Sequence, residues 1–155
     1  MLKGLASDLT GSADVCRVVP AQELSSCLAS QFLLPPSETL LFSLQSSKEE
    51  FSLSNEALLR VQGESATTTR KIVTRFDYKS HIVADVRFET AGRVDRDCEL
   101  KFVIGSESVS IDIRKDQEPQ ARELYKVLEL LSRAQKSHER QWEFSRVALD
   151  KAAQA

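Results

Sequence analysis

The segment that most constrains the fold runs from Ile82 to Arg114, where apolar and polar residues alternate in three stretches separated by two polar turns. The stretches are IVADVRFET, CELKFVI and SVSIDIR, and the turns are AGRVDRD and GSE. Because successive side chains of a strand point to opposite faces, this period of two predicts three antiparallel strands joined as a meander. One face of the resulting sheet is apolar, so the fold needs another element to cover it.

Alternation within the three strands predicts which residues share a face. The apolar face carries Ile82, Ala84, Val86 and Phe88, then Cys98, Leu100, Phe102 and Ile104, then Val109, Ile111 and Ile113. The polar face carries Asp85, Arg87 and Glu89 with Val83, then Glu99 and Lys101, then Ser110, Asp112 and Arg114. The covering element is predicted to be an amphipathic helix from about Gln117, with Asp116 as its cap, Pro119 in its first turn and a stripe of Ala121, Leu124, Leu128 and Leu131.

Four further strands are predicted upstream, in ETLLFSLQS, FSLSN, ALLRVQG and the β-branched run that contains Thr69 to Thr74. Before them the pattern favours helix. Leu2, Leu5 and Leu9 have helical spacing within residues 1–9, Ser12 can cap a turn that carries Val15, Val18 and Val19, and AQELSSCLASQFLL reads as a helix that ends before Pro35 and Pro36. The chain is therefore predicted to be α+β, with seven strands.

Composition limits the class of protein. The chain has 155 residues, of which 41% are hydrophobic and 28% charged, and these values are ordinary for a single globular domain. Its net charge of −2 argues against nucleic acid as the partner. The three cysteines, Cys16, Cys27 and Cys98, show no CxxC spacing and are predicted to be buried free thiols. No secretory signal or membrane span is recognisable, so we expect the cytoplasm or another reducing soluble compartment.

Several segments of the sequence resemble those of the bacterial-type pleckstrin-homology domain family. The similarity lies in ETAGRVDRDCELKF from Glu89 to Phe102, with SATTTRK and FDYKSH upstream and VSIDI downstream. It implies a pleckstrin-homology-like seven-stranded antiparallel barrel or sandwich, capped by a C-terminal helix and extended by extra N- and C-terminal helices. The domain would then span 33–134, after an N-terminal helical segment at 1–32 and before a C-terminal helical extension at 135–155. The resemblance also implies a noncatalytic protein that assembles into cyclic homo-oligomers through strand surfaces.

The sequence contains few candidates for catalytic or metal-binding residues. His81 and His138 lie far apart in sequence, and no nucleophile elbow or phosphate-binding glycine loop is present. Asp95 and Asp97 lack a third oxygen ligand at loop spacing, so they do not predict a metal site. We therefore expect no enzymatic activity, no catalytic residues, no bound metal and no cofactor.

Two surfaces remain as candidates for binding. The first is a basic cluster, whose alternative interpretation is a solvated sheet face: Arg70, Lys71, Arg75, Lys79 and Arg87. It would bind an anionic ligand or an acidic partner. The turn expected to hold a phosphoinositide between the first two long strands, from Gln45 to Glu50, has one lysine beside two glutamates, which argues against such a site.

The second candidate surface is an assembly surface. It combines a turn of alternating charge with a C-terminal segment that carries the only tryptophan: Glu89, Arg93, Asp95, Arg96 and Asp97, with Trp142, Phe144 and Val147. The alternatives are local ion pairing within the turn and folding of the terminal segment onto its own domain. We therefore expect a noncatalytic binding or assembly module that self-associates or joins a larger protein complex. The alternative is a peripheral membrane or anionic lipid-headgroup adaptor that uses the basic cluster, and membrane contact is the less favoured of the two.

Overall fold

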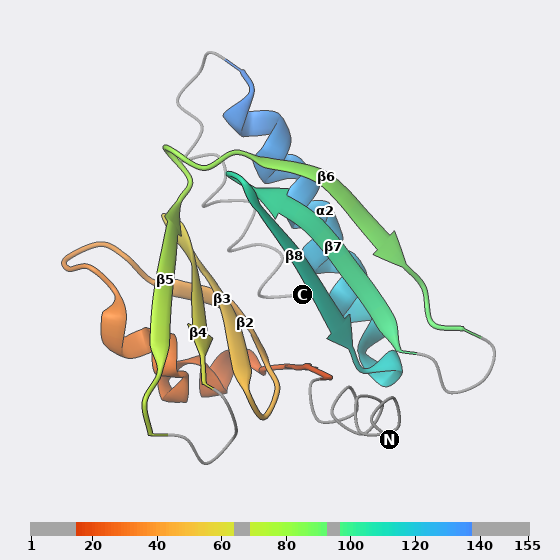
Figure 1. Ribbon diagram of the computed structural model, residues 1–155, viewed down its shortest axis with the longest axis horizontal. Helices are drawn as coiled ribbons and strands as arrows, with labels where there is room; N and C mark the ends of the chain where they lie inside the picture. The colour runs from red at the N-terminus through yellow and green to blue at the C-terminus, as the bar shows by residue number, and fades with distance from the viewer. Residues whose placement is uncertain (1–14, 64–68, 93–96, 138–155) are drawn as a thin grey trace.

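The computed structural model describes residues 15–63, 69–92 and 97–137. Within these ranges eight strands form two antiparallel sheets (Figure 1). The first sheet contains, in order, β1 (Arg17–Val18), β2 (Leu40–Gln45), β3 (Glu49–Ser54), β4 (Ala57–Gln62) and β5 (Ile72–Asp77). The second contains β6 (Val83–Glu89), β7 (Cys98–Ile104) and β8 (Glu107–Ile113). The seven predicted strands are confirmed as β2 to β8.

The short strand β1 was not predicted. The sequence pattern indicated a helical turn there, but Val18 pairs with Leu44 of β2 instead. The side chain of Gln117 completes the strand from the other side, since its Oε1 accepts from the Val18 N–H at 2.7 Å and its Nε2 donates to the Val18 carbonyl at 3.3 Å. A side chain 99 residues away thus supplies the hydrogen bonds that decide the conformation of this segment.

The predicted covering helix is confirmed as α2 (Glu118–Gln135), which packs on the sheet of β6, β7 and β8 (Figure 1). A short 3₁₀ helix, η3 (Lys115–Gln117), precedes it, so Gln117 rather than Asp116 occupies the N-cap position. Pro119 lies in the first turn, as expected. The predicted stripe is buried, together with two further residues of the same face: Ala121, Leu124, Leu128 and Leu131, with Val127 and Ala134.

A β-bulge alters the predicted faces of β6. Ala84 pairs with Val103 and Arg87 pairs with Lys101, so β6 has one residue more than β7 between these pairs. Asp85 within the bulge has a positive φ of 54°. The alternation therefore changes phase, so that Val83 is buried whereas Ile82 is 39% exposed. The prediction that Ile82 and Ala84 share the inner face with Val86 and Phe88 was wrong. Strict alternation of faces assumes a regular strand, and the residue inserted at the bulge reverses the alternation.

The strands that the structure describes do not close into a barrel. Within the described residues the two sheets meet at one edge, through a single bridge between Cys16 and Ile113. The main core lies between the sheets and α2, and includes Leu44, Phe51, Leu100, Ile111 and Leu128. Of the two predicted forms, barrel or sandwich, the described strands thus make a pleckstrin-homology-like sandwich with a C-terminal helix, with eight strands in place of seven.

The outer face of the five-stranded sheet is also covered. Two 3₁₀ helices, η1 (Ala21–Ser26) and η2 (Leu28–Phe32), take the place of the one predicted helix. The break falls at Cys27, whose backbone is extended. A second small core beneath them contains Ala29, Ala57, Leu59 and Val61. The predicted helices at residues 1–9 and beyond residue 137 lie outside the described ranges, and the boundaries at residues 32 and 134 stay predictions.

Candidate functional site

The five predicted basic residues do not converge on one point. Arg70 and Lys79 are exposed at opposite ends of β5, and Lys71 lies just before that strand. Arg75 is within β5, and Arg87 is on β6 of the other sheet. Binding a cluster of phosphates requires several cations around one ligand. The described structure offers no such arrangement of these five side chains.

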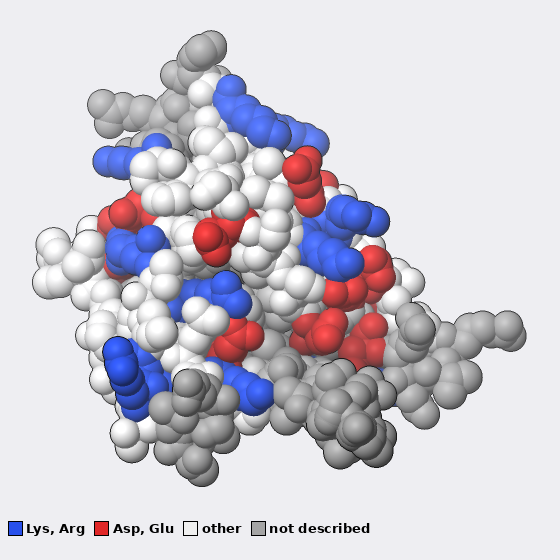
Figure 2. Space-filling model, viewed as in Figure 1, with Lys and Arg blue, Asp and Glu red and all other residues white. Residues whose placement is uncertain are grey.

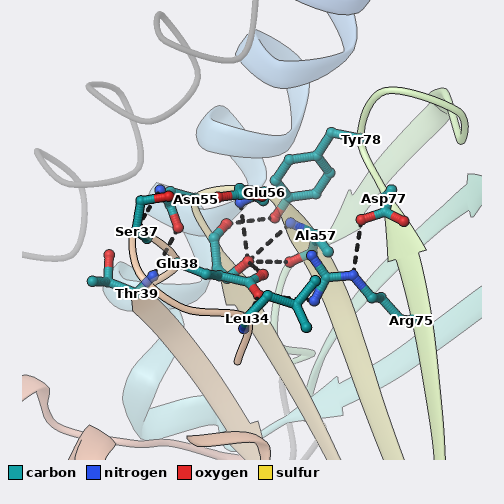
Figure 3. A network of polar contacts seen from close by, with 11 residues as sticks. Leu34, Ser37, Glu38, Thr39, Asn55, Glu56, Ala57, Arg75, Asp77 and Tyr78 are labelled. Atoms are coloured by element: carbon teal, nitrogen blue, oxygen red, sulfur yellow. Dashed lines mark hydrogen bonds and ion pairs between the residues drawn. The ribbon is translucent and has the colours of Figure 1, made fainter. Parts of the chain in front are cut away.

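Arg75 is already paired inside the protein (Figure 3). Its Nη1 lies 2.8 Å from Oε1 of Glu38, and its Nε lies 2.8 Å from Oδ1 of Asp77. The Glu38 side chain is fully buried, whereas Asp77 is half exposed. These two carboxylates neutralise the guanidinium, so Arg75 belongs to a structural network and not to an open anion site.

The Glu38 carboxylate is the centre of that network. Besides Arg75 it accepts the Leu34 N–H at 2.9 Å and the hydroxyl of Ser54. Burial opposes ionisation of Glu38, but the hydrogen bonds from Arg75, Ser54 and Leu34 outweigh it and hold the pKa below its usual value. Nearby, the buried Tyr78 hydroxyl donates to the Ser54 carbonyl at 2.9 Å, and burial raises the pKa of Tyr78 strongly. Figure 3 shows how these contacts fasten the segment before β2 to the sheet.

A pocket of about 210 Å³ lies at the turn between β2 and β3. Its lining includes two lysines, Lys48 and Lys71, with polar residues of the turn and two apolar residues: Gln45, Ser46, Ser47, Glu49 and Glu50, with Leu28 and Val61. Both glutamates have other partners within the fold. Glu49 pairs with Arg60 at 2.7 Å, and the buried Glu50 accepts the Leu28 and Ala29 N–H groups at 2.9 and 2.8 Å. The sequence argument, which set these glutamates against Lys48, could not show where their carboxylates point.

The predicted assembly surface is only partly described. Arg93, Asp95, Arg96, Trp142, Phe144 and Val147 lie outside the described residues. Asp97 is exposed, and Glu89 Oε2 lies 3.8 Å from Lys101 Nζ. Next to the turn, the Ala91 N–H donates to Glu118 of α2 at 3.1 Å. The assembly role of this turn stays a prediction.

The outer face of the sheet of β6, β7 and β8 carries two parallel rows of charge. Glu89 pairs in register with Glu99, and Glu99 with Asp112, which makes an acidic row across the three strands. The next outward positions, Arg87 and Lys101, pair in the same way and make a basic row that ends in Ser110. Figure 2 shows red and blue side by side over this sheet. Sequence alternation assigned these residues outward, but only the register places like charges directly opposite each other.

Other kinds of site are absent from the described ranges. No group of three or more His, Cys, Asp or Glu residues there is placed to hold a metal ion. None of the helices in those ranges has the length and apolarity needed to cross a bilayer. Cys16, Cys27 and Cys98 are buried and form no disulfide within the described ranges, as the sequence predicted, and burial is the leading cause that raises the pKa of Cys27 and of Cys98.

Solved structures share this fold. A bacterial protein with a pleckstrin-homology domain from Exiguobacterium sibiricum 255-15 superposes with a TM-score of 0.75 and 30% identity, over 91% of this chain and 75% of that one. A DUF1696 family protein with a pleckstrin-homology domain from Shewanella loihica PV-4 matches with a TM-score of 0.57 over 76% of this chain and 97% of that one. Its identity is 19%, so it supports the fold alone.

Sequence comparison gives the same result. The uncharacterized protein YvbH of Bacillus subtilis (strain 168) is 34% identical over 129 residues, which are 83% of this chain. The chain spans 63% of the length of that relative. The profile of the family described as "Bacterial PH domain" matches residues 10–131. The strand order, the covering helix and these matches agree, and the chain therefore belongs to the bacterial pleckstrin-homology domain family.

Proposed function

We propose that this chain is a noncatalytic binding module that assembles with other protein chains, either its own copies or subunits of a larger complex. Membership of a pleckstrin-homology family supports a binding or adaptor role. The observation that carries the proposal is the outer face of the sheet of β6, β7 and β8, which is exposed and bears ordered charges of both signs (Figure 2). Charged groups of alternating sign at a surface favour specific pairing with a complementary protein.

A second candidate function is an anionic lipid-headgroup adaptor. The pocket beside Lys48 and Lys71 favours it, because two lysines at one hollow could attract a phosphate group. The rest of the predicted basic cluster gives it no support. Arg75 is neutralised by Glu38 and Asp77, and Arg87 is on the other sheet.

Two measurements on the purified chain distinguish the two functions: light scattering gives the mass of the assembly, and cosedimentation with vesicles reports lipid binding. We expect a defined multimer at low and moderate salt, and no cosedimentation with vesicles that contain an anionic lipid. A shortened chain that ends at Ser137 tests the predicted role of the C-terminal extension. The cut follows Gln135 because that side chain accepts the Val83 N–H at 2.9 Å and donates to the Tyr78 and His81 carbonyls at 2.7 and 2.9 Å.

Three outcomes of these measurements separate the two functions. A multimer that ignores vesicles supports assembly, and its loss in the shortened chain assigns that role to the C-terminal extension. A monomer that cosediments with anionic vesicles, and that dissociates from them as salt rises, would support the lipid adaptor instead. A monomer that also ignores vesicles would refute self-association and leave docking to a different subunit as the remaining form of the proposal.

A further inference from the structure

Strand β5 presents an open edge of the first sheet. Four described strands lie at sheet edges, namely β1, β5, β6 and β8, and three of them are shielded. Strand β1 is short and is bound by Gln117, β6 has the bulge at Asp85, and β8 is bridged to Cys16. In contrast, β5 pairs with β4 in a regular register and lies at the margin of its sheet, on the side away from β7 and β8 (Figure 1). Bulges, short length and covering segments are the usual protection of an edge, and β5 has none of these within the described residues.

The backbone groups on this edge can be assigned from the pairing with β4. Hydrogen-bonded pairs alternate along an antiparallel ladder, and the Tyr78 N–H donates to the Glu56 carbonyl at 3.0 Å. The even-numbered residues of β5 therefore bond to β4, and the odd-numbered residues direct their backbone groups outward. The outward groups are the N–H and C=O of Val73 and Arg75 and the N–H of Asp77. None of them has a hydrogen-bond partner within the described residues.

Such a row of backbone groups is complementary to an extended chain. Alternate residues of a strand are about 7 Å apart, so the outward donors and acceptors of β5 repeat at that distance. Another extended backbone presents its own N–H and C=O groups at the same spacing, whereas a compact ligand does not. The geometry of the edge therefore selects a strand-like segment as the binding partner.

The charges along the edge favour an acidic segment. Arg70 precedes β5 and Lys79 follows it, and both side chains are exposed. Between them, Arg75 is neutralised by Glu38 and Asp77. The residues of the predicted basic cluster that belong to the first sheet thus follow a line along β5, which suits carboxylates at the two ends of an extended chain better than one compact phosphate.

Exposed apolar side chains lie near the same edge on both faces of the sheet. Ile72 is 60% exposed at the start of β5, on the face opposite to Val73. Leu34 is 53% exposed, and its N–H binds the same oxygen of Glu38 as Nη1 of Arg75, which places it beside β5 on the other face (Figure 3). Apolar side chains in the middle of an added strand would cover both residues.

We propose that the edge of β5 binds an extended segment of an acidic partner protein, which adds to the first sheet as a sixth strand. The segment has a β-branched centre and carboxylates at both ends. Backbone hydrogen bonds to Val73 and Arg75 hold it, and Arg70 and Lys79 select its charge. Binding at this edge needs no self-association, so it goes beyond the assembly function proposed above and can fail or succeed separately.

Amide hydrogen exchange, followed by NMR on the full chain, tests whether the edge is open. In the free chain we expect the Val73 and Arg75 amides to exchange at least about tenfold faster than those of Thr74 and Phe76, which bond to β4. Slow exchange at Val73 and Arg75 in the free chain would overturn the proposal, because it would show that another segment or a second copy covers the edge. Light scattering on the same sample distinguishes these two occupants.

A synthetic peptide tests binding. The probe is a fluorescein-labelled peptide of about nine residues, enough to span β5 and both flanking cations, with alternating valine and threonine at its centre and two glutamates at each end. We expect saturable binding by fluorescence anisotropy, and exchange at the Val73 and Arg75 amides slowed at least about tenfold. A version with N-methylated central amides should not bind, and a version with lysines in place of the glutamates should bind about tenfold more weakly.

A pair of variants at Val73 tests the backbone contact. Val73→Pro removes an outward N–H without removing a bond to β4, and we expect it to bind the peptide about tenfold more weakly. Val73→Ala is the matched control, since it shortens the side chain, keeps the N–H and should bind as the wild type does. Circular dichroism verifies that both variants remain folded.

A second pair of variants tests the charge. Arg70→Glu with Lys79→Glu should weaken binding about tenfold, because attraction at both ends becomes repulsion. Arg122→Glu with Lys126→Glu makes the same change of charge at exposed positions of α2 and should leave the affinity unchanged.

Three results would overturn the docking edge and leave the assembly function untouched. The first is the absence of saturable binding. The second is equal affinity of Val73→Pro and Val73→Ala, which would show that the backbone is not contacted. The third is a bound peptide that leaves exchange at Val73 and Arg75 unchanged, which would place the binding site elsewhere on the chain.

Discussion

Glu38 and Glu50 are buried carboxylates that accept backbone N–H groups from the N-terminal part of the chain. Glu38 binds Leu34, and Glu50 binds Leu28 and Ala29. Each residue also bonds to a serine hydroxyl of β3. Burial of a carboxylate is costly unless all of its oxygens are satisfied, so these contacts fix one position for the segment above the sheet.

Replacing Glu38 should be costly, because its removal leaves the partly buried Arg75 without its main counter-ion. Arg75 Nη2 is already buried with no hydrogen-bond partner in the described structure. We expect Glu38→Gln to lower the free energy of unfolding, measured in urea, by about 2–4 kcal/mol. Asp77→Asn is the control, since that half-exposed partner of Arg75 should contribute less than about 1 kcal/mol. Equal losses in the two variants would contradict this account.

The same carboxylate predicts a dependence on pH. The pKa of Glu38 is lower in the folded chain than in the unfolded chain, where it is about 4.3. Its contribution to stability is therefore complete above that value and is lost as pH falls through the folded pKa. The difference in unfolding free energy between wild type and Glu38→Gln should thus be largest near neutral pH and should shrink below about pH 4. A difference that stays constant down to pH 3 would exclude an ionised Glu38.

Among the elements, β6 contains a bulge that its sequence pattern does not predict. Asp85 has a φ of 54°, a conformation that glycine adopts without strain and that is common at such bulges. The bulge moves Val83 inward and still allows Val86 and Phe88 to pack on the core. It also brings Arg87 into register with Lys101, which places the basic row on the outer face.

We expect the glycine variant to be the more stable of the two at the bulge, and the alanine variant to be the more stable in a regular strand. At Asp85 we expect the glycine variant to be more stable than the alanine variant by about 1 kcal/mol, because alanine is strained at positive φ. At Thr74 within β5, glycine should be less stable than alanine by about 0.5–1 kcal/mol. Thermal unfolding of the four variants measures both orders. The same order at both positions would show that the bulge is not retained in solution.

Across the whole molecule, residues before β2 are part of the packed structure. Strand β1 joins the first sheet, the backbone of Cys16 bonds to Asp112 of the second sheet and to Arg114 just after it, and Ala29 is buried in the smaller core. Gln117, the N-cap residue of α2, binds both backbone groups of Val18. The N-terminal segment thus contacts both sheets and the start of the helix.

A shortened chain that begins at residue 33 should therefore lose much of its stability. It would expose Leu59 and Val61 and remove two of the hydrogen-bond donors of Glu50. We expect the chain 33–137 to unfold without a cooperative transition in urea, whereas the chain 15–137 should retain one, because it keeps every described contact. Circular dichroism follows both transitions. A cooperative transition of similar midpoint in the two chains would confine the folding unit to residues after 32.

The sequence by itself determined the elements that depend on local patterns. Alternation predicted the seven long strands, and the spacing of Leu124, Leu128 and Leu131 predicted α2, because each pattern follows from the geometry of one strand or one helix. The residue sequence from Glu89 to Phe102 indicated the family, which the family model confirms. Alternation also placed the charged residues Arg87 and Glu89 on one face of β6, but it did not show which residues of β7 lie opposite them.

Only the tertiary structure decided the features that join distant parts of the chain. Strand β1 depends on Gln117, 99 residues away, and Arg75 is neutralised by Glu38, 37 residues away. The inserted residue at Asp85 and the register of β6, β7 and β8 arrange the two charged rows. None of these has a local signature, because a hydrogen bond or a cross-strand pair depends on where the chain returns in space. The period of a single strand predicts which side chains point outward, whereas their neighbours are set by packing between strands.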